Sequence, residues 1–257
     1  MKIKRYINNE LIAPTLFGMT VLITWWAIIR ILGVKSYVFP TPVEILSEFF
    51  KHYPLLWPAT EVTAIEAIVG LGFGFIAASL IATFSSKINI VRKSLAPYLV
   101  ILQTTPIPAV APLFVLWFGE GIWSRTMSAF AICVVPMTIS MTQSLMVVDG
   151  GRSELYQVFG YGPVWRFLNV TVPLAIPGTI SALQFGVMLA VVGAVVGELV
   201  TADGGVGYVI IQSSYSLDTP LLFAAIACAA LIGFVLFSLV RILSVFINVS
   251  KYYIAER

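Results

Sequence analysis

The sequence predicts an all-α integral membrane protein with six membrane-spanning helices, and two observations carry this prediction. Hydrophobic residues make up 59% of the 257 residues, and charged residues make up only 11%. A soluble domain ordinarily has about a quarter charged residues and under half apolar ones. Several apolar runs also exceed the ~18 residues that mark a membrane-spanning helix. A soluble protein with an unusually apolar core does not account for these values.

The chain is expected to form a single transmembrane domain over residues 1–257. The predicted spans cover about residues 11–33, 62–84, 95–118, 126–148, 174–199 and 221–247. The first run is too long for the core of a signal peptide and has no small-residue cleavage site after it, so we expect it to be retained. Cys133 and Cys228 are single residues within apolar runs, and no cluster of residues has metal-ligand spacing. We therefore expect no metal site.

The connector between the first two spans, residues 34–60, is rich in proline. Within it, residues 41–44 have the sequence TPVE, which is a capping box with proline at the first helical position. The apolar residues that follow recur on one helical face and predict an amphipathic helix over about residues 42–53, lying at the outer membrane interface. We interpret this connector as a packed segment rather than a functional lid. His52, the only histidine, is expected to be an exposed loop residue.

Two of the spans carry small residues at close helical spacing, which predicts tight helix contacts in lipid. These residues are Gly70, Gly72, Gly74, Ala77 and Ala78 in the second span and Gly186, Ala190, Gly193 and Gly197 in the fifth. The same two spans contain carboxylates. Glu66 lies about one turn inside the second span, and Glu198 ends the fifth. A carboxylate within a membrane is a functional candidate by default, but an interfacial position for Glu66 fits the sequence equally well.

The third span contains four prolines and a polar stretch, QTTPIP. Internal prolines free backbone carbonyls and bend a helix. In hydrocarbon such irregular backbone is tolerated only where it faces protein or a water-filled cavity. We therefore interpret the stretch as part of a translocation pathway, although a helix bent only for packing remains open. The pathway candidates are Gln103, Thr104, Thr105, Pro106, Pro108 and Glu198.

The distribution of basic residues predicts the orientation of the chain. With the N-terminus inside, eleven lysines and arginines fall on the inner side: Lys2, Lys4, Arg5, Lys87, Arg92, Lys93, Arg152, Arg166, Arg241, Lys251 and Arg257. Four fall on the outer side: Arg30, Lys35, Lys51 and Arg125. The positive-inside rule then places both termini in the cytoplasm. It also places residues 149–177 there.

Residues 149–177 have the sequence DGGRSELYQVFGYGPVWRFLNVTVPLAIP. We expect a first short helix to begin at about Glu154 and a sharp turn at Gly160 and Gly162. A second short helix over residues 164–172 is expected to end at Pro173. Such a pair would project as a rigid knob that suits docking into a groove of a soluble protein, so that movement of the knob tilts the attached spans.

This segment resembles the EAA loop of permeases of ATP-binding cassette (ABC) importers. Glu154, Gly160, Val170, Val172 and Pro173 fall at matching places, whereas Leu155 and Tyr156 replace the usual two alanines. The segments PTPVEIL, TTPIPAVAPLFVLWFGEG and GELVTADGGVGYVI also resemble permeases of the nitrate, sulfonate and taurine branch, which includes relatives that handle thiamine-precursor pyrimidines. The resemblance spans roughly residues 38–250. It implies these contact residues for an ATPase: Glu154, Leu155, Tyr156, Gly160, Tyr161, Gly162, Val170, Val172 and Pro173.

The resemblance further implies a type I importer fold in the inner (cytoplasmic) membrane. Two permease copies, expected to be a homodimer, would form the pore, and two cytoplasmic ATPases would bind the loops. An extracytoplasmic substrate-binding protein would deliver the solute. The chain has no G-x-x-x-x-G-K-[ST] motif, so ATP and Mg would be bound by the partner ATPase and the chain would not be an enzyme. Glu154 would contact the ATPase or cap a helix, while Gly160 and Pro173 would chiefly shape the loop.

Two other classes of function were weighed against an importer that works by alternating access. An ion-coupled carrier or channel could use Glu66 or Glu198, but the chain shows no convincing internal repeat. A membrane enzyme would need clustered polar residues within its spans, which are lacking. No nucleic-acid partner is expected. The solute is expected to be small and polar, such as nitrate, a sulfonate, taurine or a pyrimidine precursor, and the sequence does not choose among them.

Overall fold

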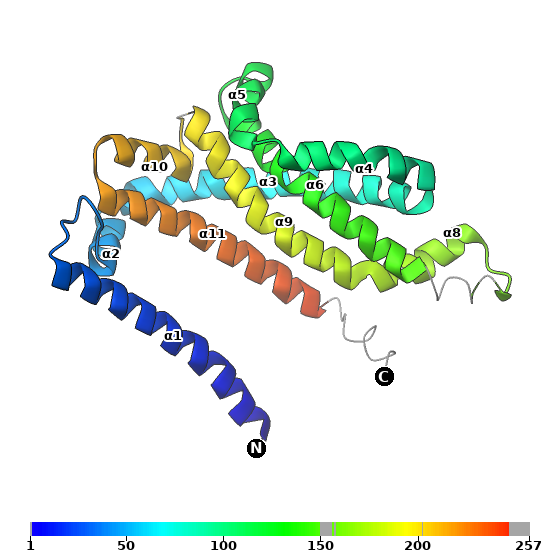
Figure 1. The fold of residues 1–257 in the computed structure, drawn as a ribbon, viewed down its shortest axis with the longest axis horizontal. Helices are drawn as coiled ribbons and strands as arrows, with labels where there is room; N and C mark the ends of the chain where they lie inside the picture. Colours follow the sequence, from blue (N-terminus) through cyan, green and yellow to red (C-terminus); the bar gives the residue numbers. More distant parts are fainter. Residues whose placement is uncertain (1, 150–155, 157, 202, 247–257) are drawn as a thin grey trace.

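The computed structural model describes residues 2–149, 156, 158–201 and 203–246, and all regular structure among them is helical. The elements in chain order are α1 (Lys2–Leu32), α2 (Pro42–Lys51), α3 (Tyr53–Lys87), α4 (Asn89–Thr104), α5 (Ile107–Phe118), α6 (Ile122–Asp149), α8 (Pro163–Arg166), the π-helical segment η1 (Phe167–Thr171), α9 (Val172–Thr201), α10 (Gly205–Tyr215) and α11 (Thr219–Phe246). Figure 1 shows the long helices arranged side by side, with α10 and α8 at opposite ends of the bundle.

The predicted all-α membrane fold is confirmed. Five helical stretches among the described residues are long and apolar enough to cross a membrane, and a bent pair, α4 and α5, supplies a sixth if it counts as one span. The third predicted span is therefore not one kinked helix but two helices bent by 97° at residues 105 and 106. The physical cause is Pro106, which offers no N–H for a helical hydrogen bond and restricts Thr105 to the extended conformation that it adopts.

The centre of the bundle is α6, which packs between α3 and α9. Both neighbouring helices approach Ala129 of α6 through glycine. A Cβ atom at Gly70 would lie 2.6 Å from the Cβ of Ala129, and one at Gly193 would lie 2.6 Å from its Cα. Real side chains do not fit at these distances, so glycine at both positions is what lets the three backbones meet. The predicted close contacts along the second and fifth spans are thus present.

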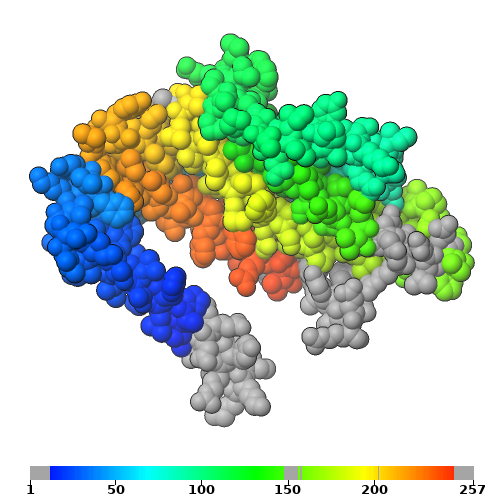
Figure 2. All heavy atoms as spheres, viewed as in Figure 1, coloured from blue at the N-terminus to red at the C-terminus, as the bar shows by residue number. Residues whose placement is uncertain are grey.

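The helix α1 lies largely apart from this bundle. Its upper end is joined to the rest by an aromatic cluster in which the Trp25 and Phe39 ring centroids are 5.4 Å apart and the Phe39 and Phe223 centroids are also 5.4 Å apart. Figure 2 shows α1 diverging from α11 below this point. Within the single chain, the apolar side chains of Ile12–Leu32 therefore remain largely exposed.

The predicted capping box at the start of α2 is present. The backbone N–H of Thr41 donates to Glu44 Oε2 over 2.7 Å, and the N–H of Glu44 donates to Thr41 Oγ1 over 3.3 Å. The backbone hydrogen bond from Thr41 lowers the pKa of Glu44 below its ordinary value. The helix ends at Lys51, close to the predicted end. However, the connector is shorter than expected because α3 already begins at Tyr53, with Pro54 accommodated in its first turn.

Two further expectations about local structure were wrong. No helix was predicted over residues 201–220, but they contain the helix α10, whose first N–H groups are bound by side chains from other helices. Pro173 does not end a short helix, because α8, η1 and α9 form one stretch from Pro163 to Thr201. The missing N–H of Pro173 is accommodated by the wider π-helical turn before it, in which Val172 N–H bonds to the carbonyl of Phe167.

The glycine packing yields a first prediction. Replacing Gly193 with alanine should destabilise the bundle by about 1 to 3 kcal/mol, because the new methyl group overlaps the backbone of α6. The same change at Gly233 of α11, where no heavy atom lies within 4 Å, should have little effect. Thermal unfolding of both variants in mild detergent measures the difference, and equal melting temperatures would show that the contact does not limit the packing.

The capping box yields a second prediction, with its sign set by the lowered pKa of Glu44. A carboxyl group whose pKa is lower in the folded state than in the unfolded state stabilises the fold at pH values above its unfolded-state pKa. This stabilisation is lost as the pH falls through the folded-state pKa. The amides of α2 should therefore lose hydrogen-exchange protection over that acidic interval. A Glu44→Gln variant should show no such step. The same acid-dependent loss in both proteins would contradict the assignment.

Candidate functional site

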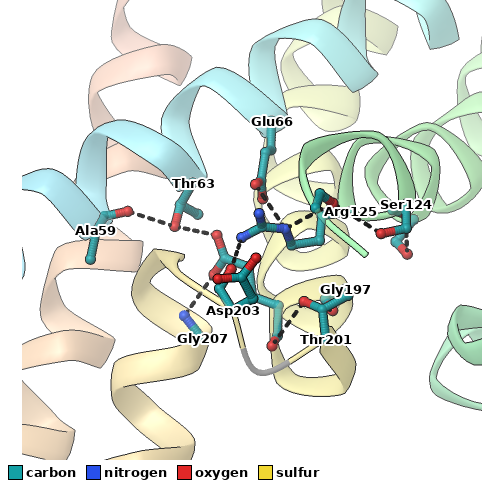
Figure 3. Close-up of polar contacts among 12 residues, drawn as sticks. Ala59, Thr63, Glu66, Ser124, Arg125, Gly197, Thr201, Asp203 and Gly207 are labelled. Atoms are coloured by element: carbon teal, nitrogen blue, oxygen red, sulfur yellow. Dashed lines mark hydrogen bonds and ion pairs between the residues drawn. The ribbon is translucent and has the colours of Figure 1, made fainter. Parts of the chain in front are cut away.

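Three ionisable side chains meet inside the bundle, one from each of its central helices. Glu66 of α3 and Glu198 of α9 are fully buried, and Arg125 of α6 is 5% exposed. Arg125 Nε lies 3.1 Å from Glu66 Oε1 (Figure 3). Each residue stands about one turn from the glycine contacts at Ala129, so the close packing of the backbones brings the three charges together.

The cluster also holds the start of α10. Glu198 Oε1 accepts a hydrogen bond from the Thr63 hydroxyl over 2.5 Å, and Glu198 Oε2 accepts one from the Gly207 N–H over 2.6 Å. The N–H of Val206 donates to Thr63 Oγ1 over 2.9 Å. The unpaired N–H groups of a helix start need acceptors and favour negative charge. Side chains from α3 and α9 therefore supply the N-terminal cap of α10.

The turn that leads into α10 is shaped around Glu198. Arg125 Nη1 donates to the backbone carbonyl of Asp203 over 2.5 Å, which joins α6 to the same turn (Figure 3). Gly205 has a φ of +78°, and a Cβ there would overlap the Glu198 carboxyl group. A Cβ at Gly207 would lie 2.7 Å from Glu198 Cβ. The glycines of the GELVTADGGVG segment thus make room for a carboxylate.

Sequence reasoning found only part of this cluster. Glu66 is fully buried within the bundle, and Glu198 lies within α9 rather than at an exposed end. Arg125, which lies just before the fourth predicted span, is a buried residue of α6. The roles of Thr63 and Gly207 were missed. Residues of opposite charge near the ends of three apolar spans were the available signal, since buried charges in membranes are almost always paired.

The pathway candidates at the break between α4 and α5 are separate from the hydrogen-bond network of this cluster. Gln103, Thr104, Pro106 and Pro108 are exposed in the single chain, and Thr105 is half-buried. The hydroxyls of Thr104 and Thr105 donate to carbonyls of their own helix. The protein groups that hydrogen-bond to Glu198 are Thr63 and Gly207, so the structure does not join it to the residues at the break.

The predicted ATPase-contact loop is described only in part. Glu154 and Leu155 lie outside the described residues. From Tyr156 onward, three aromatic rings pack together. Tyr161 and Trp165 are stacked with their centroids 4.1 Å apart, and Tyr156 meets Tyr161 edge to face with their centroids 5.9 Å apart. Gly160 makes the expected turn with a φ of +82°. Around it, Val158 and Phe159 are 84% and 75% exposed, which is unusual for apolar side chains outside an apolar span.

This loop is continuous with the bundle. Gly162 precedes the uninterrupted helical stretch that includes Val170, which is buried, Val172, which is exposed, and Pro173, which is half-buried. The Lys87 ammonium group at the end of α3 lies 4.1 Å from the centre of the Phe167 ring, within cation–π range. Any displacement of the loop would therefore act directly on α9.

The fold and the loop define a multi-pass α-helical membrane transport subunit, and comparison with known proteins identifies the family. Residues 70–248 match the family model of the binding-protein-dependent transport system inner membrane component, and the chain belongs to this family. It is 34% identical to a probable ABC transporter permease protein of Haemophilus influenzae, over 84% of this chain and 89% of that one. This family membership favours a transport subunit of an ABC importer over the alternative of an ion-coupled carrier or channel.

Other relatives carry more specific names. The chain is 31% identical to the formylaminopyrimidine transport permease protein ThiX of Halalkalibacterium halodurans, over 91% of this chain and 94% of that one. It is 32% identical to the riboflavin transport system permease protein RibX of Chloroflexus aurantiacus, over 88% and 85%. Among solved structures, the MetNI methionine ABC transporter in an inward-facing conformation has a similar fold, with a TM-score of 0.62 and 18% identity over 74% of this chain and 97% of that one.

The charge cluster yields a third prediction. Arg125→Met should destabilise the protein by about 3 to 5 kcal/mol, because it leaves buried carboxyl groups without their cation. Arg30→Met, at an exposed position near the end of α1, should change stability little. Thermal unfolding of the purified variants provides the comparison. An Arg125→Met protein as stable as the control would show that the ion pair is dispensable.

Proposed function

We propose that the chain is the permease subunit of an ATP-driven importer that moves a small polar solute by alternating access. The observation that carries the proposal is the exposed apolar loop around Gly160, which runs without interruption into α9. A surface of this kind suits a protein partner, and the chain has no phosphate-binding motif of its own. The family of the chain and the printed names of its relatives support the same function.

The proposed mechanism follows from the packing. Closure of two partner ATPases on ATP would carry the loops with it, and each loop would pull on α9. Because α9 packs on α6 and α6 packs on α3 through glycine contacts, the three helices would tilt together. Two copies of the chain would enclose the pathway, and the break between α4 and α5 would line it. Such a loop couples one bistable assembly to another.

The proposed partners and location complete this picture. ATP and Mg would be bound by the cytoplasmic ATPases, and a substrate-binding protein would deliver solute from outside. The chain would lie in the inner (cytoplasmic) membrane with both termini in the cytoplasm. The eleven-to-four distribution of basic residues supports this orientation. It puts the residues around Gly160 on the side where ATP is available.

The solute class is narrowed by the relatives. Those named for formylaminopyrimidine and riboflavin are 31% and 32% identical to the chain, and one named for aliphatic sulfonates, from Bacillus subtilis, is 30% identical. The side chains at the break, Gln103, Thr104 and Thr105, are polar and uncharged. Uncharged heterocycles of the pyrimidine-precursor type suit such a lining, and sulfonates, taurine and nitrate are the other members of the proposed range.

The loop yields a fourth prediction. Trp165→Ala should reduce copurification of the partner ATPase at least tenfold, because it removes the ring on which Tyr161 stacks. Tyr215→Ala removes a more exposed aromatic ring at the other end of the bundle and should leave copurification unchanged. Gly160→Val should act like Trp165→Ala, since valine is strained at a φ of +82°. Normal ATPase binding and uptake by the Gly160→Val and Trp165→Ala proteins would contradict the proposed contact.

The solute proposal is tested with the reconstituted complex. Liposomes containing the permease, its ATPase and its binding protein should hydrolyse ATP faster in the presence of the transported solute. A panel of formylaminopyrimidine, riboflavin, taurine, an alkyl sulfonate and nitrate covers the range. Stimulation by a pyrimidine alone would support the narrower class, and stimulation by none of the five would contradict the proposed range.

A further inference from the structure

The charges of the buried cluster do not balance. Two carboxyl groups, those of Glu66 and Glu198, share a single guanidinium group, that of Arg125, and all three side chains are at most 5% exposed. The remaining charged group that acts on Glu66 is Asp203, which is also acidic and lies on the exposed turn. From α10 the cluster receives only backbone N–H groups. If both buried carboxyls were ionised, the cluster would carry one uncompensated negative charge.

The Glu66 carboxyl group also lacks hydrogen-bond donors. Both of its oxygens are buried without a hydrogen-bond donor among the described residues, and Oε1 has only the ion-pair contact with Arg125 Nε. Glu66 and Glu198 meet in one cluster, since Glu198 bonds to Thr63, which lies about one turn before Glu66 on α3. Ionised carboxylates only accept hydrogen bonds, and like charges that share a dry site repel strongly. A protonated carboxyl group, in contrast, can donate a hydrogen bond.

We propose that Glu66 and Glu198 together bind one proton, which the Glu66 carboxyl group carries. The proton supplies the missing donor and leaves the cluster with one carboxylate, one protonated carboxyl and one guanidinium, so that its net charge is zero. Both oxygens of Glu198 then keep their bonds to Thr63 and Gly207, and α10 stays attached to α3, α6 and α9.

A proton fits this site better than a metal ion does. Calcium takes six to eight oxygen ligands and magnesium six, whereas the cluster offers two carboxyl groups, one of them already bonded at both oxygens. A guanidinium group beside the site also repels a second cation. No group of three or more His, Cys, Asp or Glu residues with metal-binding geometry occurs among the described residues.

The bound proton makes the junction sensitive to pH. A glutamate in the unfolded chain releases its proton well below neutral pH, whereas the folded protein retains one. The folded state therefore binds more protons than the unfolded state at neutral pH, and its stability should decrease as the pH rises. Loss of the proton would leave a buried negative charge beside the start of α10 and weaken its attachment. Glu66→Gln carries a permanent amide donor and should remove this alkaline loss.

Infrared spectroscopy tests the proposal on the full chain in detergent. Protein labelled with ¹³C-glutamate should show, at neutral pH, one isotope-sensitive carbonyl band of a protonated carboxylic acid. The band should be lost in Glu66→Gln and in Glu198→Gln. It should persist in Glu61→Gln, which changes an exposed glutamate of the same helix. A wild-type protein without this band would overturn the proposal, and that measurement needs no variant.

Thermal unfolding of the glutamine variants provides a second test, because each variant changes the net charge of the cluster. Each single glutamine variant keeps one carboxylate for Arg125 and should stay folded, with a smaller drop in melting temperature toward alkaline pH than the wild type shows. The double variant leaves Arg125 unpaired and should melt below both singles. An unchanged alkaline drop in Glu66→Gln, or a sodium-dependent rise in the wild-type melting temperature without the infrared band, would overturn proton binding.

Discussion

The close approach of three backbones at Ala129 is the constraint on which the rest of this structure depends. Gly70 and Gly193 meet Ala129 from two sides, and a methyl group at either glycine would overlap α6. Glu66 lies about one turn from Gly70, Arg125 lies about one turn from Ala129, and Glu198 lies just over one turn from Gly193. Helices held apart by larger side chains could not bring these charged groups into contact. The contacts among the charged groups therefore depend on the packing of the small residues.

The charged groups in turn decide where α10 lies. The first N–H groups of a helix need hydrogen-bond acceptors, and in the interior of a membrane protein water does not provide these acceptors. Thr63 and Glu198 provide those acceptors from two different helices. The turn into α10 passes close to the Glu198 carboxyl group, and a side chain larger than that of glycine would not fit at Gly205 or Gly207. One buried cluster thus positions four helices.

The opposite end of the same helices carries the surface proposed for the ATPase. Tyr156, Tyr161 and Trp165 form an aromatic cluster on the loop, and the helix that follows runs through Pro173 into α9. Because α9 contains both the continuation of the loop and Glu198, one helical element connects the loop with the buried cluster. The proposed coupling to an ATPase would need a connection of this kind.

The sequence by itself determined the fold class, the approximate spans, the capping box at Thr41 and the glycine faces, because these depend on composition and on patterns within one helix. It also indicated the family through the segment around Gly160. Only the tertiary structure decided that α4 and α5 separate at a right-angle break, that Pro173 lies inside a continuous helix and that residues 205–215 are helical. It also decided that Arg125 pairs with Glu66 and that Glu198 accepts a hydrogen bond from the N–H of Gly207. Those outcomes depend on which side chains from distant parts of the chain satisfy a freed backbone group or a buried charge, and spacing along one helix does not contain that information.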